Sequence, residues 1–249
     1  MKKFGMVGVA FIAVMMMSVG PVSAAGVERS FKDDLGPVTV GAVRNQGGAY
    51  QAPFIVWGGD VALMLANGGL TTRQGTFFAE RGLNVKLVPG DAFLPQVRDY
   101  MSGASPFLRG TTHMIYLATE VLNSDPRTKP VMLFQLTFSG GDHMVARENV
   151  RTVVDLRGKT IVLQKYGPHV GFVDDILATG NLTWDDVTII WAEDLTGTDN
   201  SPAAIFRANP NVAVCCVITP DMLGLTGGQQ QIGTGAEETV RGANVLVST

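Results

Sequence analysis

Short apolar runs alternate with helix-like segments along most of this chain, and that alternation limits the folds open to it. The runs at 53–57, 83–88 and 159–164 have the length of single strands and are rich in Val, Ile, Leu or Phe. Helix-like segments follow them, and two of these end at Gly82 and Gly103. Strands that alternate with helices predict parallel sheets covered on both faces, so we expect an α/β fold with mostly parallel sheets.

The alternation occurs twice, with a break near Gly140-Gly141. Before the break we expect strands at 38–43, 53–57, 83–88 and 131–137, and helices at 61–66, 73–81, 93–101 and 111–123. After it we expect strands at 143–147, 159–164, 187–191, 212–218 and 244–247, and helices at 150–158, 169–179, 202–208 and 220–225. Each half holds about three strand–helix units, which predicts two α/β lobes joined by a hinge. One doubly wound domain is the alternative.

The predicted domain limits follow from these elements. The first lobe spans 25–137, and its first residues, 25–37, form a mobile leader. The second lobe spans 138–243. Residues 244–249 form a strand that returns toward the first lobe.

The first 24 residues have the layout of a secretory signal peptide. Lys2 and Lys3 precede a charge-free run at 4–19, and Val22, Ser23 and Ala24 place small residues at the cleavage positions. The run is shorter than the roughly 20 residues that a membrane-spanning helix needs. We therefore expect an exported, periplasmic protein; an uncleaved membrane anchor is the alternative.

Composition excludes several classes of function. Hydrophobic residues make up 46% of the chain and charged residues 16%, which is the opposite of a disordered protein. With 19 Lys and Arg against 22 Asp and Glu, the net charge is −3. Nucleic-acid binding calls for clustered Lys and Arg, so we expect no nucleic-acid partner.

The motifs of common enzymes and metal sites are missing from the sequence. It has no Gly-x-Ser-x-Gly elbow, no phosphate-binding glycine loop and no Cys-x-x-Cys or His-Glu-x-x-His spacing. Cys215 and Cys216 are adjacent in a predicted strand, so their side chains point to opposite faces and are expected to be buried and unbonded. We predict no catalytic residues, no cofactor and no metal; a metal site assembled in space from Asp142, His143 and His169 remains an alternative.

Turns that follow predicted strands carry the candidate ligand-binding residues. In open α/β sheets, ligands bind where strands end and helix N-termini present backbone N–H groups. The candidates are Trp57, Gly58, Gly59, Asp60, Gly110, Thr111, Thr112, Asp142, Gly167, His169 and Asp221. Ordinary helix capping is the alternative for Asp60, Thr111 and Asp221. The candidate turns lack clustered Arg and Lys, with Arg109 as the exception. Because highly charged anions are bound by arginine in a bidentate geometry, this scarcity disfavours such a ligand.

Four segments together resemble a known family. They are 57–69, 77–86, 150–161 with its Asp-Leu-Arg-Gly-Lys-Thr-Ile stretch, and 181–188. In order and spacing they resemble the solute-binding proteins of ABC importers, in the group that includes nitrate, sulfonate, taurine and thiamine-precursor binders. The resemblance implies two α/β lobes with a cleft that closes on a small-molecule solute. It also implies a monomer that delivers the solute to an ABC permease in the inner membrane.

The resemblance leaves two points open. Relatives continue with further helices after a strand like 244–249, so we expect the chain to be a fragment or its first lobe to be abbreviated. The function favoured is capture of a small polar solute without any reaction. The alternatives are an enzyme on the same fold, of the pyrimidine-precursor synthesis type, and a ligand-sensing accessory protein.

We predict cleavage of the leader after Ala24 or Ala25, because small residues lie at the −3 and −1 positions there. N-terminal sequencing of the protein exported by a bacterial host tests this. Recovery of intact Met1 in the membrane fraction would contradict it.

Overall fold

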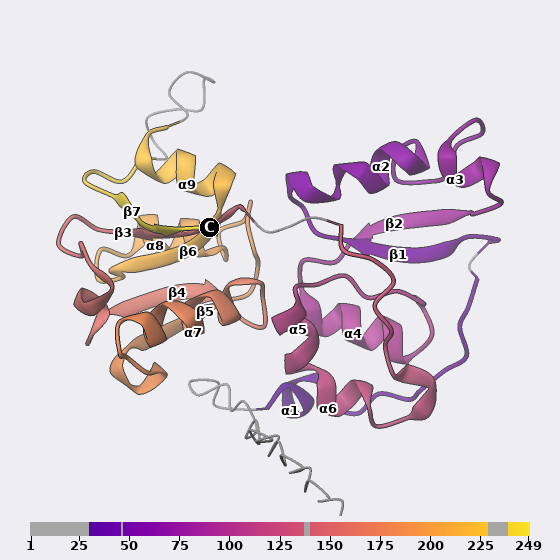
Figure 1. The fold of residues 1–249 in the computed structure, drawn as a ribbon, viewed down its shortest axis with the longest axis horizontal. Coiled ribbons are helices and arrows are strands. Elements are labelled where there is room, and N and C mark those ends of the chain that lie inside the picture. The colour runs from indigo at the N-terminus through magenta and orange to yellow at the C-terminus, as the bar shows by residue number, and fades with distance from the viewer. Residues whose placement is uncertain (1–29, 46, 137–139, 229–238) are drawn as a thin grey trace, which may run out of the picture.

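The chain folds into two α/β lobes that lie side by side (Figure 1). The computed structural model describes residues 30–45, 47–136, 140–228 and 239–249. The predicted signal peptide at 1–24 lies outside the described residues. Within the described ranges, no helix is both long and apolar enough to cross a membrane.

The first lobe is built on two parallel strands, β1 (Tyr50–Phe54) and β2 (Val85–Pro89). One face packs on α2 (Val61–Asn67) and α3 (Phe77–Glu80) around Phe54, Val85 and Leu87. The short helix η1 (Gly58–Asp60) precedes α2. On the other side, a separate helical core is formed by α1 (Phe31–Leu35), α4 (Phe93–Met101), α5 (Thr112–Leu117) and α6 (Thr119–Leu122), followed by η2 (Pro126–Thr128).

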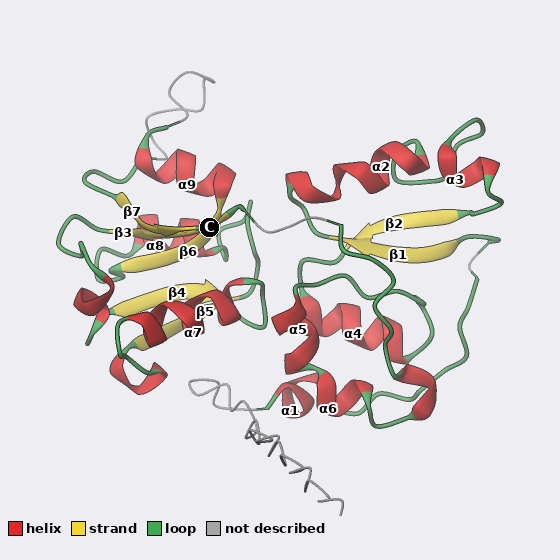
Figure 2. Cartoon of the chain, in the orientation of Figure 1, coloured by secondary structure: helices red, strands yellow, loops and turns green. Residues whose placement is uncertain are grey.

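The second lobe contains a five-stranded sheet in the order β5-β4-β6-β3-β7. Its strands are β3 (Asp142–Ala146), β4 (Thr160–Gln164), β5 (Thr188–Ala192), β6 (Val214–Ile218) and β7 (Asn244–Ser248). β4, β5 and β6 run parallel, whereas β3 is antiparallel to β6 and to β7. Helix α7 (His169–Thr179) covers one face; α8 (Pro202–Ala208) and α9 (Thr219–Thr226) cover the other, as Figure 2 shows. Two short helices, η3 (Val153–Leu156) and η4 (Trp184–Asp186), precede β4 and β5.

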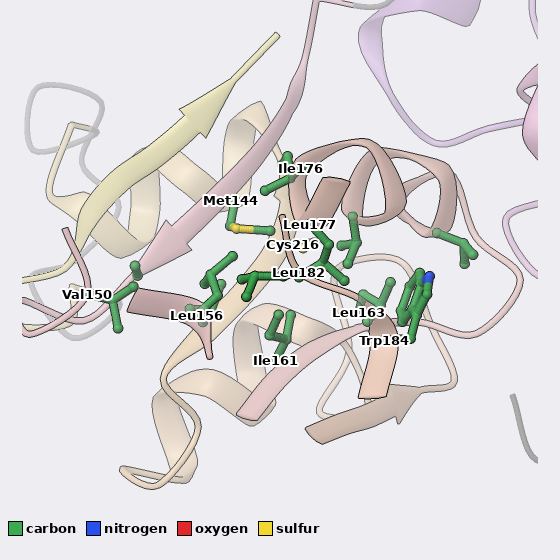
Figure 3. Packing of buried hydrophobic residues seen from close by; sticks show 14 residues of the cluster. Met144, Val150, Leu156, Ile161, Leu163, Ile176, Leu177, Leu182, Trp184 and Cys216 are labelled. Carbon is green, nitrogen blue, oxygen red and sulfur yellow. The ribbon is translucent and has the colours of Figure 1, made fainter. Parts of the chain in front are cut away.

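The adjacent cysteines confirm the alternation of side chains along β6. Cys216 packs with Met144, Ile161 and Leu177 in the core beneath α7 (Figure 3). Cys215 lies on the opposite face, in the core beneath α8 and α9. Both thiols are free and fully buried, as predicted.

The predicted leader at 25–37 is wrong where the structure describes it, because residues 31–35 form α1. Phe31 and Leu35, four residues apart, are both buried in the first-lobe helical core. The Ser30 side chain caps the helix by accepting a hydrogen bond from the backbone N–H of Asp33.

Two strands predicted in the first lobe do not form. Residues 38–43 form no strand, and Gly41 donates its N–H to the carbonyl of Met101 at the end of α4. Residues 131–136 have no strand partner, and the side chains of Val131 and Met132 are 79% and 89% exposed. An apolar run alone does not make a strand, because a strand also needs a neighbour to hydrogen-bond.

Three predicted helices are shorter than expected. Gly75 adopts a left-handed φ of 79°, so α3 begins only at Phe77. The helix predicted at 111–123 breaks at Ala118 into α5 and α6. The helix predicted at 150–158 is reduced to η3.

The terminal strand belongs to the second-lobe sheet rather than to the first lobe. β7 pairs with β3, with His143 opposite Ser248. Its last residues lie beside the crossover between the lobes, where Thr249 donates its N–H to the carbonyl of Asp142. The exact lobe limits, 25–137 and 138–243, stay a prediction.

We expect Phe31→Ala to lower the free energy of unfolding by about 3 kcal/mol, because it empties a buried aromatic site. The Phe31 ring is 6% exposed and packs edge-to-face on Phe93 and Tyr166. Chemical denaturation measures the change. Phe77→Ala is the control, since Phe77 is 53% exposed; equal losses in the two variants would contradict the placement of α1.

Candidate functional site

The carboxyl ends of the parallel strands face one another across the boundary between the lobes. β1 and β2 end there from the first lobe, and β4, β5 and β6 end there from the second. β3 begins at the same edge because its Asp142 pairs with Ile218, the last residue of β6. We call the connecting segments at this boundary the facing turns: residues 55–60, 90–92, 109–112, 141–142, 164–169, 193–195 and 218–221.

An apolar contact joins the facing turns near the crossover. Ile55 of the first lobe forms a buried cluster with Leu195 and Ile218 of the second, and Trp57 packs against it. The Trp57 ring also lies against Gly141, where an added Cβ would come within 3.1 Å of it. Trp57 is partly exposed, so its ring forms an apolar wall at the boundary.

A polar contact between the lobes is made by Gln164, the last residue of β4. Its amide nitrogen Nε2 donates to the carbonyl of Asp91 in the first lobe at 3.0 Å and to the carbonyl of Glu193 at 3.3 Å. The Gln164 side chain is fully buried, and its oxygen Oε1 has no hydrogen-bond partner among the described residues. That oxygen lies against Gly167.

His169 is the first residue of α7 and lies next to Asp142. Its ring is fully buried, and Nε2 lies 3.2 Å from Asp142 Oδ1. Neither ring nitrogen has a hydrogen bond of acceptable geometry within the described part of the chain, although Asp142 lies close by. Through Gly141 and Asp142, the structure brings Trp57 and His169 to the same region.

A second histidine, His143, is held by hydroxyl groups. Nε2 lies 2.9 Å from Thr219 Oγ1, and Nδ1 lies 2.8 Å from Ser248 Oγ. Burial lowers the pKa of His143, and the Asp142 carboxylate partly offsets that shift. The alternative prediction is a metal site at Asp142, His143 and His169. Within the described ranges, no group of His, Cys, Asp and Glu residues is arranged to hold a metal ion.

Asp60 is a buried ion-pair partner and not a helix cap. Its carboxylate is fully buried, accepts the backbone N–H of Ile55 at 2.7 Å and pairs with Arg109, whose Nη2 lies 2.7 Å from Oδ1. The pair ties the turn after β1 to the turn before α5. The capping alternative for Asp60 is therefore wrong: Asp60 stands at the N-cap position of α2, but its side chain makes no capping hydrogen bond.

Capping is also the alternative for Thr111 and Asp221, and it is correct for Thr111 only. Thr111 caps α5, since its hydroxyl accepts the N–H of Met114. Asp221 lies inside the first turn of α9, where Ile218 is the N-cap residue.

The remaining candidates also border the boundary. Gly110 and Thr112 flank the start of α5, and the next residue, His113, packs against Gly171 of α7 so closely that a Cβ there would lie 2.3 Å from the ring. Gly58 and Gly59 belong to η1 and are at least partly exposed.

Sequence reasoning missed three residues of the facing turns. Asp91 follows β2, Gln164 ends β4 and Asp194 follows β5. The rule that selected Trp57 and His169, polar residues where strands end, would have found all three if it had been applied to every strand.

A further contact between the lobes joins the facing turn at 164–169 to Asp34, which lies outside the facing turns. Tyr166 of the second lobe adopts a left-handed φ of 57° and inserts its ring, 2% exposed, into the first-lobe core. Its hydroxyl donates to Asp34 at 2.9 Å, and Lys165 forms an ion pair with the same carboxylate. This contact holds the turn that carries Gly167 and His169 against the first lobe.

A hollow of about 100 Å³ lies within the first lobe, between the sheet and α4. Gln51, Pro53, Gly90, Gln96 and Ser105 are among its lining residues. It is smaller than the roughly 300 Å³ at which ligand pockets begin. It is separate from Trp57 and His169 and adds no ligand-binding residue to the facing turns.

Comparison with solved structures identifies the fold. The alkanesulfonate-binding protein SsuA from Xanthomonas axonopodis pv. citri bound to MOPS matches at a TM-score of 0.53 with 17% identity, over 83% of this chain and 62% of that one. The periplasmic nitrate-binding protein NrtA from Synechocystis PCC 6803 matches at 0.54 with 17% identity, over 80% and 51%. A periplasmic sulfonate-binding protein SsuA from Methylobacillus flagellatus KT matches at 0.50 with 16% identity, over 84% and 58%.

The chain therefore has the two-lobed α/β fold of periplasmic solute-binding proteins. Within that class, the structures it resembles are named as alkanesulfonate-, sulfonate- and nitrate-binding proteins, and the Methylobacillus protein is named as part of a sulfonate ABC transporter. This chain spans less than two thirds of the length of each. No family model and no curated protein sequence matches it.

We expect Asp60→Ala to cost about 3 kcal/mol of stability, more than the loss of a cap, because Arg109 loses its partner in a largely buried site. Urea denaturation measures the cost. Glu120→Ala is the control: its ion pair with Lys32 is exposed, so its loss should cost much less stability than the loss of Asp60. A small and equal effect of both changes would show that the Asp60–Arg109 pair is not structural.

Proposed function

We propose that this protein is a periplasmic solute-binding component of an ABC importer, which captures a small polar solute between its lobes and delivers it to a membrane permease. The observation that carries the proposal is the meeting of strand ends from both lobes at one boundary. Ligands of open α/β sheets bind where strands end. A solute held there contacts both lobes at once, so its binding favours their closure.

The proposed site lies between the turn after β1 and the turn before α7. Trp57 supplies an apolar wall and an indole N–H donor, and His169 and Asp142 orient a polar group of the solute. The N-terminus of α7 adds backbone N–H groups beside Gly167. The proposed role needs no chemical step.

The enzyme alternative gains no support from the cysteines. Burial raises the pKa of both thiols, Cys215 and Cys216, and a buried thiol is a poor nucleophile. The structures that share the fold carry the names of binding proteins.

We expect Trp57→Ala and His169→Ala to weaken solute binding by roughly tenfold or more, because each removes a direct contact. A thermal-shift screen of amino acids, amines, sulfonates, nitrate, bicarbonate and pyrimidines identifies the solute, since a ligand of the folded state raises the melting temperature. Calorimetric titration then measures the affinity of each variant.

Phe77→Ala, an exposed aromatic change on α3, is the matched control and should bind like the parent. Thermal unfolding without solute checks that each variant is folded. If folded Trp57→Ala and His169→Ala bind the solute as tightly as the parent, the site is elsewhere.

A further inference from the structure

We propose that the solute is an organic cation with N–H donors, carrying a primary ammonium or a guanidinium group, and not an oxyanion. This inference rests on the proposed function and specifies the chemistry of the same site. It separates this chain from the structures that share its fold and are named for binding sulfonate or nitrate.

The first argument is the charge of the facing turns. Acidic residues come from both lobes: Asp91 from the first, and Asp142, Glu193, Asp194 and Asp221 from the second. The Arg and Lys residues on these turns are Arg109 and Lys165. His169 is the histidine there, and its ring nitrogens have no hydrogen-bond partner among the described residues.

Each of these two cations already has a carboxylate partner. Arg109 pairs with Asp60 inside the first lobe, and Lys165 pairs with Asp34. Oxyanions are usually held by arginine in a bidentate geometry. An oxyanion at the facing turns would have to take a cation from an existing pair. An organic cation would meet carboxylates whose partners are neutral donors: Asp91 accepts the backbone N–H of Val56, and Asp194 accepts the hydroxyl of Thr198.

The second argument is the amide oxygen of Gln164. Its Oε1 is buried at the boundary with no hydrogen-bond partner among the described residues, while Nε2 of the same group is used twice. A buried acceptor without a donor is costly, so a solute that supplies an N–H group gains a hydrogen bond there. Nitrate and sulfonate groups carry only acceptors at neutral pH and cannot satisfy it.

The helix N-termini do not reverse this preference. The start of α7 has the Asp142 carboxylate 3.2 Å from His169 Nε2, and α9 carries Asp221 in its first turn. A carboxylate near a helix N-terminus offsets the partial positive charge of the backbone N–H groups. What remains at the boundary is a surplus of negative charge.

Like charges from opposite lobes also connect binding with closure. Burial raises the pKa of Asp91, backbone N–H groups of Val56 and Asp91 partly offset that shift, and the carboxylates of Asp60 and Asp194 add smaller increases. Asp91 and Asp194 come from different lobes, so their repulsion opposes approach of the lobes. A cation between them removes that repulsion and stabilises the closed arrangement.

Matched probes test the charge class on the full exported protein. The probes are butylammonium and butylguanidinium against butanesulfonate and nitrate, each at the same concentration in a thermal-shift assay. We expect the two cations to raise the melting temperature and the two anions to leave it unchanged. The response to the cations should fall as sodium chloride is added, because salt screens attraction between charges.

Asp194→Asn identifies the site of the response. It removes one charge and keeps an oxygen that can accept the Thr198 hydroxyl, which now donates to Asp194 Oδ2 at 2.7 Å. We expect roughly tenfold weaker cation binding by calorimetry, the size expected for one charge-assisted hydrogen bond. Asp175→Asn, an exposed change on α7, is the matched control and should bind as the parent does.

The outcomes separate this inference from the proposed function. A response to butanesulfonate or nitrate that Trp57→Ala abolishes would support solute binding and overturn the cation inference. No response to either pair of probes would count against both. A response to cations that Asp194→Asn and Asp175→Asn reduce equally would place the cation elsewhere and overturn the inference.

Discussion

The rest of this structure depends on one constraint: the strands that end at the lobe boundary run in a common direction within each lobe. Because β4, β5 and β6 run parallel, their carboxyl ends and the helix starts that follow them share one edge of the second-lobe sheet. The parallel pair β1 and β2 presents the corresponding edge of the first lobe. Polar residues that are far apart in the sequence meet at this boundary for that reason.

Contacts of different kinds hold the lobes together. Ile55, Leu195 and Ile218 form an apolar contact, and Gln164 forms a polar one. The Tyr166 ring, inserted into the first-lobe core, forms another. Opening the lobes would expose the Tyr166 ring and break the Gln164 hydrogen bond to Asp91, so any opening movement must offset both losses. Binding of a solute between the strand ends would contribute to that balance.

The local patterns in the sequence predicted much of the second lobe and less of the first. Helix α7 was predicted at 169–179 and forms over His169–Thr179, because a proline precedes it and an apolar face repeats along it. Residues 131–136 are as apolar as a strand but pair with none. Pairing depends on partners that a local pattern does not contain, which is also why α1 was missed: Phe31 and Leu35 are ordered by residues distant in the sequence.

The sequence predicted where the candidate site lies, but it did not predict all of the residues there. Strand ends selected Trp57, Asp142 and His169, which the structure brings to one region. They did not reveal that Asp60 is committed to Arg109, because that pair joins residues 49 apart in the sequence. That Gln164 Oε1 has no hydrogen-bond partner among the described residues could be found only from three-dimensional contacts.

The central claim, that the two lobes form one solute-binding site, is tested most directly by the distance between them in solution. Spin labels at Gln74→Cys and Asp185→Cys place one probe on an exposed residue of each lobe, and the buried Cys215 and Cys216 should not react. Pulsed electron paramagnetic resonance then measures the distribution of distances between the two spin labels, with and without the solute. Saturating solute should shift the distribution toward a single, shorter distance. An unchanged distribution, with binding confirmed in the same sample, would contradict it.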